Sequence, residues 1–242
     1  MTCILLILKN LLELFLNNHK MSYISFKNVT KKYYEYSVFD KLTLDLNAES
    51  INFFNGPVGS GKSTFIKLII GIIKPDTGKL IVGGNDMLRI KKEKLTDLRK
   101  KIGLISRELK LINSYTVQEN IILPLLFLGI EYEEAKKRSE IIIDLVNLKK
   151  KINFFPKNLT EGELQLTRLA RAIVHQPRLV LADEPFTYLD DYNKVLFTEI
   201  IKSYNRTGTT FIITSSVETA FFSNQNFFKF SKGTIFSGKN KG

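Results

Sequence analysis

Residues 52–73 of the chain, NFFNGPVGSGKSTFIKLIIGII, contain the residue types of a phosphate-binding loop. Gly56, Gly61, Lys62 and Ser63 satisfy the pattern G-x-x-x-x-G-K-[ST]. In such a loop, successive backbone N–H groups point at phosphate oxygens, the lysine reaches the β- and γ-phosphates, and the hydroxyl binds Mg²⁺. The pattern therefore predicts a nucleotide site, with Lys62 catalytic and Ser63 a metal ligand. The predicted nucleotide-binding residues of the loop are Gly56, Pro57, Val58, Gly59, Ser60, Gly61, Lys62, Ser63 and Thr64.

The segments on both sides of the loop supply the setting that this pattern needs. The run SINFFN before the loop is typical of a buried strand, and STFIKLIIGII after it has the apolar spacing of a helix. A helix that begins at the loop adds positive potential where the phosphates bind. The alternative, a glycine turn that precedes a helix by chance, is disfavoured by this strand–loop–helix order.

A second motif with chemical potential is RLVLADEP, at residues 178–185. An apolar run that ends in Asp183 predicts a buried strand with a carboxylate at its C-terminal edge, where it can serve Mg²⁺ opposite Ser63. Glu184 follows directly and is suited to polarise an attacking water as a general base. A solvated turn is the alternative interpretation, and the preceding phosphate loop makes it the weaker one.

The order of the predicted elements indicates an α/β domain. Strands are predicted over 23–29, 41–47, 50–54 and 178–185, and again in GTTFIITSS and FFKFSKGTIF. A short basic helix is predicted over 95–101, and the runs TVQENIILPLLFLGI and EYEEAKKRSEIIIDLVNL have helical spacing. Helices in the middle and strands outside predict a helical subdomain inserted over about 107–175.

Composition restricts the classes of protein that the chain can belong to. The 242 residues, 44% of them hydrophobic and 25% charged, suffice for a full core and exclude a disordered protein. A single cysteine, Cys3, allows no disulfide within the chain and indicates a reducing compartment. The net charge of +12 comes from scattered lysine pairs, which favours a solvated basic surface over a nucleic-acid site, with a role at a membrane surface second.

Residues 1–20, MTCILLILKNLLELFLNNHK, differ in composition from the rest of the chain. Their apolar stretch is interrupted by Lys9 and Glu13 and is shorter than the roughly 20 residues that a spanning helix needs. The segment has no basic start and no small-residue cleavage site, which disfavours a signal peptide. Two interpretations stay open: an amphipathic helix that lies on a membrane, and a start upstream of the native one, because a strand-like run begins at Met21.

The motifs GPVGSGKST, NLTEGELQLTRLARA, RLVLADEP and YLDD, in this order, resemble those of the ATP-binding cassette proteins, the ATPase subunits of ABC transporters. The resemblance covers nearly all of residues 21–236 and is closest to the branch of the macrolide-export, lipoprotein-release and FtsE-type cell-division ATPases. It implies an ABC-type ATP-binding domain over 21–242, with a mixed sheet core, an antiparallel β edge subdomain and an inserted α-helical subdomain. It also implies a head-to-tail dimer that holds two ATP molecules at its interface.

The resemblance assigns further roles to single residues. Tyr33 would stack on adenine, with its neighbour Tyr34 as a rival for that role. Thr160 and Gly162 belong to the signature motif, which would contact the ATP held by the other subunit, and Asp190 in YLDD would be the inter-subunit aspartate. Asp183 and Glu184 keep the metal and general-base roles predicted above.

Three positions depart from the family pattern. Arg107, a predicted nucleotide-binding residue, stands where the family has a glutamine that touches Mg²⁺ and the attacking water, and Glu161 replaces a glycine that faces the γ-phosphate. Ser216, a predicted catalytic residue, replaces a histidine that contacts the γ-phosphate; its hydroxyl can hydrogen-bond a phosphate but brings no positive charge. Divergence in an AT-biased genome is one explanation. The other is a slow ATPase that works mainly by binding ATP.

The expected function is ATP binding and slow hydrolysis, with Mg²⁺, to drive or regulate an integral-membrane partner in another chain. That partner is a permease or an FtsX-like subunit, and the chain is expected at the inner face of the cell membrane, on the cytoplasmic side, as a homodimer or heterodimer. The alternative is an ATP-binding regulatory module with negligible turnover. A nucleic-acid ATPase is disfavoured because the sequence has no coiled-coil insertion and no second cassette.

Overall fold

A computed structural model describes residues 22–217, 226–231 and 233–238, so the expectations for residues 1–20 lie outside the described part. The strands are β1 (Ser22–Tyr33), β2 (Tyr36–Asn47), β3 (Ile51–Asn55), β4 (Thr77–Val82), β5 (Asn85–Asp86), β6 (Ile102–Ile105), β7 (Leu179–Asp183), β8 (Thr210–Ser215), β9 (Asn226–Ser231) and β10 (Thr234–Gly238). The helices are α2 (Lys62–Ile69), α3 (Lys92–Arg99), α4 (Val117–Phe127), α5 (Tyr132–Leu145), α6 (Glu161–Ile173) and α7 (Asp191–Arg206). Two short 3₁₀ helices, η1 (Lys149–Lys151) and η2 (Pro156–Asn158), precede α6.

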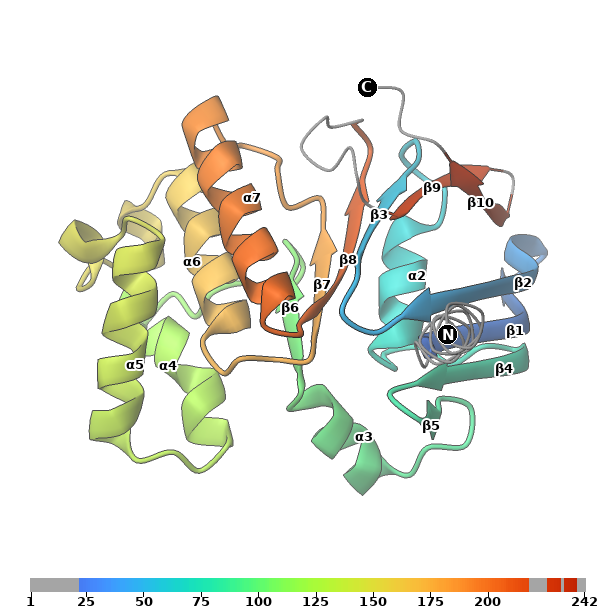
Figure 1. The fold of residues 1–242 in the computed structure, drawn as a ribbon, viewed down its shortest axis with the longest axis horizontal. Helices are drawn as coiled ribbons and strands as arrows, with labels where there is room; N and C mark the ends of the chain where they lie inside the picture. The colour runs from blue at the N-terminus through green and yellow to red at the C-terminus, as the bar shows by residue number, and fades with distance from the viewer. Residues whose placement is uncertain (1–21, 218–225, 232, 239–242) are drawn as a thin grey trace, which may run out of the picture.

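The strands form two sheets of different type. The six-stranded sheet has the order β10-β9-β3-β8-β7-β6, and all its neighbours are parallel except β9 and β10. The four-stranded sheet, β2-β1-β4-β5, is antiparallel throughout. Figure 1 shows this sheet at one side of the molecule and the helices α4, α5 and α6 at the other. The expected α/β class, with a mixed core sheet and an antiparallel edge, is confirmed.

The six-stranded sheet is buried on both faces, which explains its nearly continuous apolar strands. Side chains alternate between two cores: Phe53 packs with α4, α6 and α7, whereas its neighbour Phe54 packs with α2 and the antiparallel sheet. The ring of Phe54 lies 4.8 Å from that of Phe65 in α2. These contacts fix the start of α2 above the end of β3.

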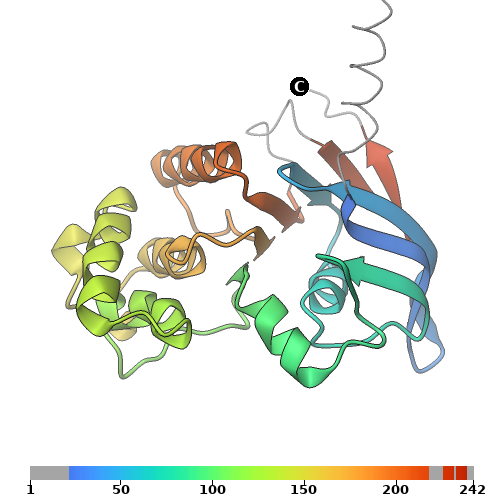
Figure 2. The ribbon, with the colours of Figure 1, turned by 60° about the horizontal axis from the view of Figure 1, so that its bottom comes forward.

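The helical subdomain is not a detached unit, because α6 lies directly on the core sheet. A Cβ atom at Gly103 in β6 would lie 2.1 Å from the carbonyl oxygen of Ala172 in α6, so glycine permits the close approach. The helices α4 and α5 complete the group, as Figure 2 shows from a second side. Among the described residues, no helix has the length and the apolar character that crossing a bilayer requires.

Several element ends differ from the predicted ones for local reasons. The helix after the phosphate loop ends at Ile69 and not at Ile73, because Gly71 takes a left-handed conformation with φ of 72°. Gly129, at φ of 78°, separates α4 from α5. The basic helix predicted over 95–101 starts three residues earlier, at Lys92, and ends at Arg99.

Candidate functional site

The predicted phosphate loop connects β3 to α2 and contains backbone that requires glycine. Gly59 and Gly61 have φ of 80° and 99°, which L side chains rarely adopt. A Cβ atom at Gly61 would also lie 2.8 Å from Cγ1 of Val38, so a side chain there would collide with β2. Helix α2 begins at Lys62, directly after the loop, and its free N–H groups form the end of the site.

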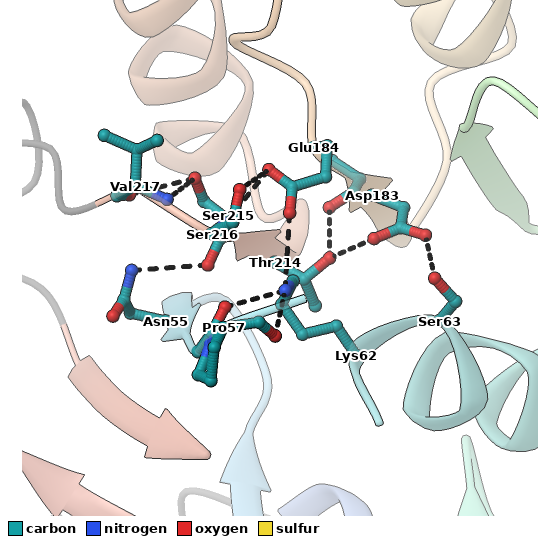
Figure 3. Close-up of polar contacts among 12 residues, drawn as sticks. Asn55, Pro57, Lys62, Ser63, Asp183, Glu184, Thr214, Ser215, Ser216 and Val217 are labelled. Atoms are coloured by element: carbon teal, nitrogen blue, oxygen red, sulfur yellow. Dashed lines mark hydrogen bonds and ion pairs between the residues drawn. The ribbon is translucent and has the colours of Figure 1, made fainter. Parts of the chain in front are cut away.

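Lys62 is held inside the loop that it follows. Its side chain is only 7% exposed, and its Nζ donates hydrogen bonds to the carbonyl oxygens of Gly56, at 2.7 Å, and Pro57, at 2.9 Å. The same Nζ lies 3.4 Å from Oε1 of Glu184. Figure 3 shows these contacts converging on one ammonium group. The motif lysine and the proposed base are therefore neighbours in space, although they are far apart in the sequence.

Asp183 links the two sequence motifs. The Ser63 hydroxyl donates to Oδ2 of Asp183 at 2.7 Å, and the Thr214 hydroxyl donates to Oδ1 at 2.6 Å (Figure 3). Asp183 ends β7 and pairs in register with Thr214 of the parallel strand β8, which explains why both side chains reach the same sheet edge. This is the C-terminal edge of the parallel strands, where α/β sheets place their ligands.

Glu184 has an unusual backbone conformation and a well-defined side chain. Its φ is 50°, in the left-handed region, and its N–H donates to the carbonyl of Thr214 at 2.9 Å. Its Oε2 accepts hydrogen bonds from Ser216, from the backbone N at 3.0 Å and from Oγ at 3.2 Å (Figure 3). The predicted catalytic residue Ser216 therefore contacts the predicted general base.

Arg107 lies away from the pair of Ser63 and Asp183. Its guanidinium carbon is 4.9 Å from the centre of the Tyr188 ring, a cation–π contact with the loop that follows Glu184. The neighbours of Arg107, Ser106 and Glu108, line a cavity of about 180 Å³ together with Ser63 and Asp183. Arg107 is not among the residues that line this cavity.

The signature residues form the first turn of α6. The Thr160 hydroxyl accepts from the N–H of Glu163 at 3.3 Å, and the Glu163 carboxylate accepts from the N–H of Thr160 at 2.9 Å, a reciprocal capping box. A Cβ atom at Gly162 would lie 3.3 Å from the carbonyl oxygen of Tyr188. The start of α6 is therefore packed against the loop that follows Glu184.

The remaining predicted residues occupy exposed positions. Tyr33 ends β1 with 42% of its surface exposed and the Nζ of Lys31 at 5.6 Å from its ring centre, whereas its rival Tyr34 is fully exposed in the turn. Asp190 caps α7 by accepting the N–H of Asn193 at 2.8 Å. Within the described part of the chain, Tyr33 and Asp190 are both exposed, and they are accessible for the nucleotide contact and the subunit contact expected of them.

Sequence reasoning missed two groups in the site. Thr214 binds Asp183, and the signal that could have revealed it is its position at the polar end of an apolar strand, FIITSS. Glu108, which pairs with Lys67 at 2.9 Å, lines the cavity beside Ser63 and Asp183, where the family glutamine was expected to act. No signal in the sequence indicates which of the adjacent residues Arg107 and Glu108 faces it.

A second arginine fixes the loop of Arg107 to α6. Both Nη atoms of Arg171 donate to backbone carbonyls, to Leu109 at 2.8 Å and to Lys110 at 3.1 Å. Burial lowers the pKa of Arg171 to about 10, and the nearby charge of Arg168 acts in the same direction. The guanidinium remains charged at neutral pH, so these bonds are charge-assisted.

Comparisons with known proteins identify relatives of the whole site. A family model described as "ABC transporter" matches residues 39–187. The cell division ATP-binding protein FtsE of Haemophilus influenzae is 36% identical over 192 residues, which cover 78% of this chain and 88% of that protein. The lipoprotein-releasing system ATP-binding protein LolD of Buchnera aphidicola is 37% identical over 194 residues, covering 78% of this chain and 85% of that protein.

A solved structure has the same architecture. The ATP-binding cassette MJ0796, in a dimeric post-hydrolysis state bound to ADP and Pi, superimposes with a TM-score of 0.83 at 27% identity. The match covers 90% of this chain and 99% of that one.

Proposed function

The chain belongs to the ABC transporter family, as an ATP-binding cassette ATPase, and we propose that its site binds Mg²⁺ and ATP through the residues described above. The observation that carries this proposal is the placement of two contacting pairs at one sheet edge: Ser63 with Asp183 at hydrogen-bond distance, and Lys62 with Glu184 at ion-pair distance. Lys62 supplies a positive charge for the phosphates, Ser63 and Asp183 supply oxygen ligands for the metal, and Glu184 supplies a base. That combination suits phosphoryl transfer.

The donor set fits a magnesium ion. Ser63 and Asp183 offer a hydroxyl and a carboxylate oxygen 2.7 Å apart, and hard cations prefer oxygen ligands. When bound, Mg²⁺ neutralises charge on the β- and γ-phosphates. Thr214 holds the other carboxylate oxygen of Asp183, which orients the group toward Ser63.

Lys62 and Glu184 complete the mechanism. Lys62 exchanges its bonds to the Gly56 and Pro57 carbonyls for phosphate oxygens, since an ammonium group has three donors and no acceptor. Loss of the contact with Lys62 leaves Oε1 of Glu184 available to accept a proton from the attacking water. Ser216 keeps Oε2 of the same carboxylate in place.

The relatives suggest how the ATPase is used. FtsE is named for cell division and LolD for lipoprotein release, and MJ0796 is a dimer. We infer a dimer of this chain with itself or with a related cassette, in which Thr160, Gly162 and Asp190 of one subunit face the ATP of the other. Hydrolysis would drive or regulate a permease or FtsX-like protein, with the cassette at the cytoplasmic face of the membrane and no nucleic acid involved.

A regulatory module with negligible turnover is the second candidate function. The observation in its favour concerns the two residues that stand in place of the family glutamine and histidine. Arg107 contacts the Tyr188 ring, and Ser216 offers Glu184 a neutral hydroxyl. Such a module would change its partner by ATP-driven dimerisation alone.

The experiment that separates these functions measures phosphate release and nucleotide binding on the same purified protein. The proposal expects binding of Mg·ATP, ATP-dependent dimers in sedimentation, and slow release of phosphate that disappears with Lys62→Ala. Binding and dimerisation without phosphate release would favour the regulatory module. Absence of nucleotide binding would contradict both functions.

A further inference from the structure

One polar side chain connects α6 to the residue after the proposed base. Gln165 is 3% exposed, and its Nε2 donates to the carbonyl oxygen of Pro185 at 2.9 Å. Pro185 directly follows Glu184. A buried amide is costly unless its groups are hydrogen-bonded, so this bond strongly restricts where the turn can lie.

The other end of the Gln165 amide is also fixed. Its Oε1 accepts from Nη1 of Arg168 at 3.0 Å, and Arg168 is itself only 9% exposed. The Nε of Arg168 is buried and has no hydrogen-bond partner among the described residues. Within the described part of the chain, the side-chain hydrogen bond of Arg168 therefore goes to the neutral amide of Gln165.

Glu161 supplies a counter-charge for this buried arginine. Glu161, Gln165 and Arg168 are spaced four and three residues apart, so they lie along one face of α6. Burial lowers the pKa of Arg168, while the negative charge of Glu161 raises it and the positive charge of Arg107 lowers it again. Glu161 therefore lies on the same face of α6 as Arg168, and its negative charge favours the charged form of that arginine.

The turn that Gln165 holds has a backbone that needs support. Glu184 and Tyr188 have φ of 50° and 69°, in the left-handed region, and such strained backbone persists only where the surrounding structure holds it. The supports come from α6 and its neighbours: Gln165 at Pro185, Gly162 at the Tyr188 carbonyl, and Arg107 on the Tyr188 ring.

We propose that Gln165, oriented by Arg168, is a positioning residue that holds the turn of Glu184 in its catalytic place. The inference rests on the proposed role of Glu184 as general base. It assigns a catalytic purpose to a face of α6 that the phosphate loop and the metal ligands do not touch.

The decisive variant is Gln165→Glu, which keeps the side-chain size and the acceptor for Arg168 but cannot donate to Pro185. We expect its kcat for Mg·ATP to fall at least about tenfold, which corresponds to about 1.4 kcal/mol of barrier. The Kd for a fluorescent ATP analogue should stay within about twofold, because Lys62 and Ser63 are untouched. The matched control is Gln118→Glu in α4, whose amide contacts Ser139 at 3.3 Å, and its kcat should not change.

Two variants at Arg168 test its orienting role. Arg168→Met should lower kcat in the same direction as Gln165→Glu, and Arg168→Lys should keep part of the lost rate because it can still donate to Oε1. Because Arg168 acts through Gln165, adding Arg168→Met to Gln165→Glu should lower kcat less than Arg168→Met does in the native protein.

Each outcome decides the proposal. Native kcat in Gln165→Glu, with native ATP affinity, overturns it while leaving the proposed function intact. If Gln165→Glu does not fold, Arg168→Met decides instead, and unchanged kcat there overturns the proposal. A native protein that binds ATP but does not hydrolyse it would overturn this proposal and favour the regulatory module.

Discussion

The phosphate-loop side and the signature side of the site are held by different kinds of contact. Lys62 and Ser63 lie at the start of α2, Asp183 ends β7 and Glu184 follows it; the direct contacts join Ser63 to Asp183 and Lys62 to Glu184. On the signature side, the first turn of α6 is held by a capping box. Arg107 packs on the ring of Tyr188, and Gly162 lies close to the carbonyl oxygen of Tyr188.

Two of the three expected departures from the family pattern, Arg107 and Glu161, lie on the signature side, whereas Ser216 follows β8 and contacts Glu184 on the phosphate-loop side. Groups at strand ends in the middle of a parallel sheet have fixed positions, so the chemistry of phosphate and metal binding leaves little freedom there. Contacts between a helix end and a loop can change together. Arg107 contacts the Tyr188 ring and Glu161 opens α6, so we interpret these two departures as coupled and the one at Ser216 as separate.

The largest effect is expected from Lys62→Ala on the phosphate-loop side. The substitution removes the buried ammonium group that contacts the loop carbonyls, and with it the only side-chain cation of the motif. ATP binding, measured by calorimetry, should be abolished. Lys74→Ala, between α2 and β4, is the control: its exposed Nζ donates to the carbonyl of Leu88, and the variant should bind ATP normally. Native affinity in Lys62→Ala would refute the site assignment.

The next effect concerns Glu184 and separates binding from chemistry. Glu184→Gln keeps the size of the side chain but cannot accept a proton, so kcat should fall about 10²–10⁴-fold while ATP still binds. Rapid-quench phosphate release measures the first quantity and equilibrium fluorescence the second. The control Glu199→Gln alters an exposed carboxylate paired with Lys202 on α7 and should keep the native rate. A loss below tenfold in Glu184→Gln would argue against a general base.

The same contrast decides what could be predicted from the sequence. The phosphate loop, the strand with Asp183 and Glu184, and the α/β class follow from local patterns, because glycine φ values, apolar runs and motif spacing are properties of short segments. The ABC family and its ATPase activity, expected from four motifs in order, are confirmed. The residue roles within the site stay predictions, although the structure brings most of the phosphate-loop side together.

The parts that could not be predicted depend on tertiary register. Thr214 reaches Asp183 only because β7 and β8 pair in parallel with those two residues opposite each other. Gln165 meets Pro185 because α6 packs on the core sheet, and a glutamine in a helix gives no sign of its partner. The stacking of Arg107 on Tyr188 likewise depends on a side-chain direction that a family comparison cannot supply.

The third prediction tests whether the departures limit turnover. Restoring Ser216→His and Arg107→Gln together should raise the rate at saturating ATP by at least about tenfold, or roughly 1.4 kcal/mol of barrier. Ser216→His should provide most of the gain, because Ser216 contacts Glu184 whereas Arg107 lies on the Tyr188 ring. Arg107→Gln alone is the comparison. A native rate of about 1 s⁻¹ or more would mean that the departures are tolerated without loss.

The smallest effect lies at the far end of α6 and concerns stability, not catalysis. His175 follows the helix; burial lowers its pKa below the ordinary value of 6.5, and a hydrogen bond with the backbone of Ile102 only partly opposes this. Within the described residues, its Nδ1 is buried and has no hydrogen-bond partner. The charged imidazolium is therefore disfavoured in the folded state, and the unfolded chain binds the proton more readily.

The sign of the pH dependence follows from this difference. Above pH 6.5 both states are neutral at His175 and stability is complete; as pH falls from there toward the folded-state pKa, the free energy of unfolding should decrease by at most about 1.4 kcal/mol per pH unit. Urea unfolding between pH 7.5 and about 5.5 measures this slope. His175→Gln should flatten it, because the side chain no longer titrates, while ATP turnover at pH 7.5 should not change. An equal slope in both proteins would show that the pH dependence of stability arises from groups other than His175.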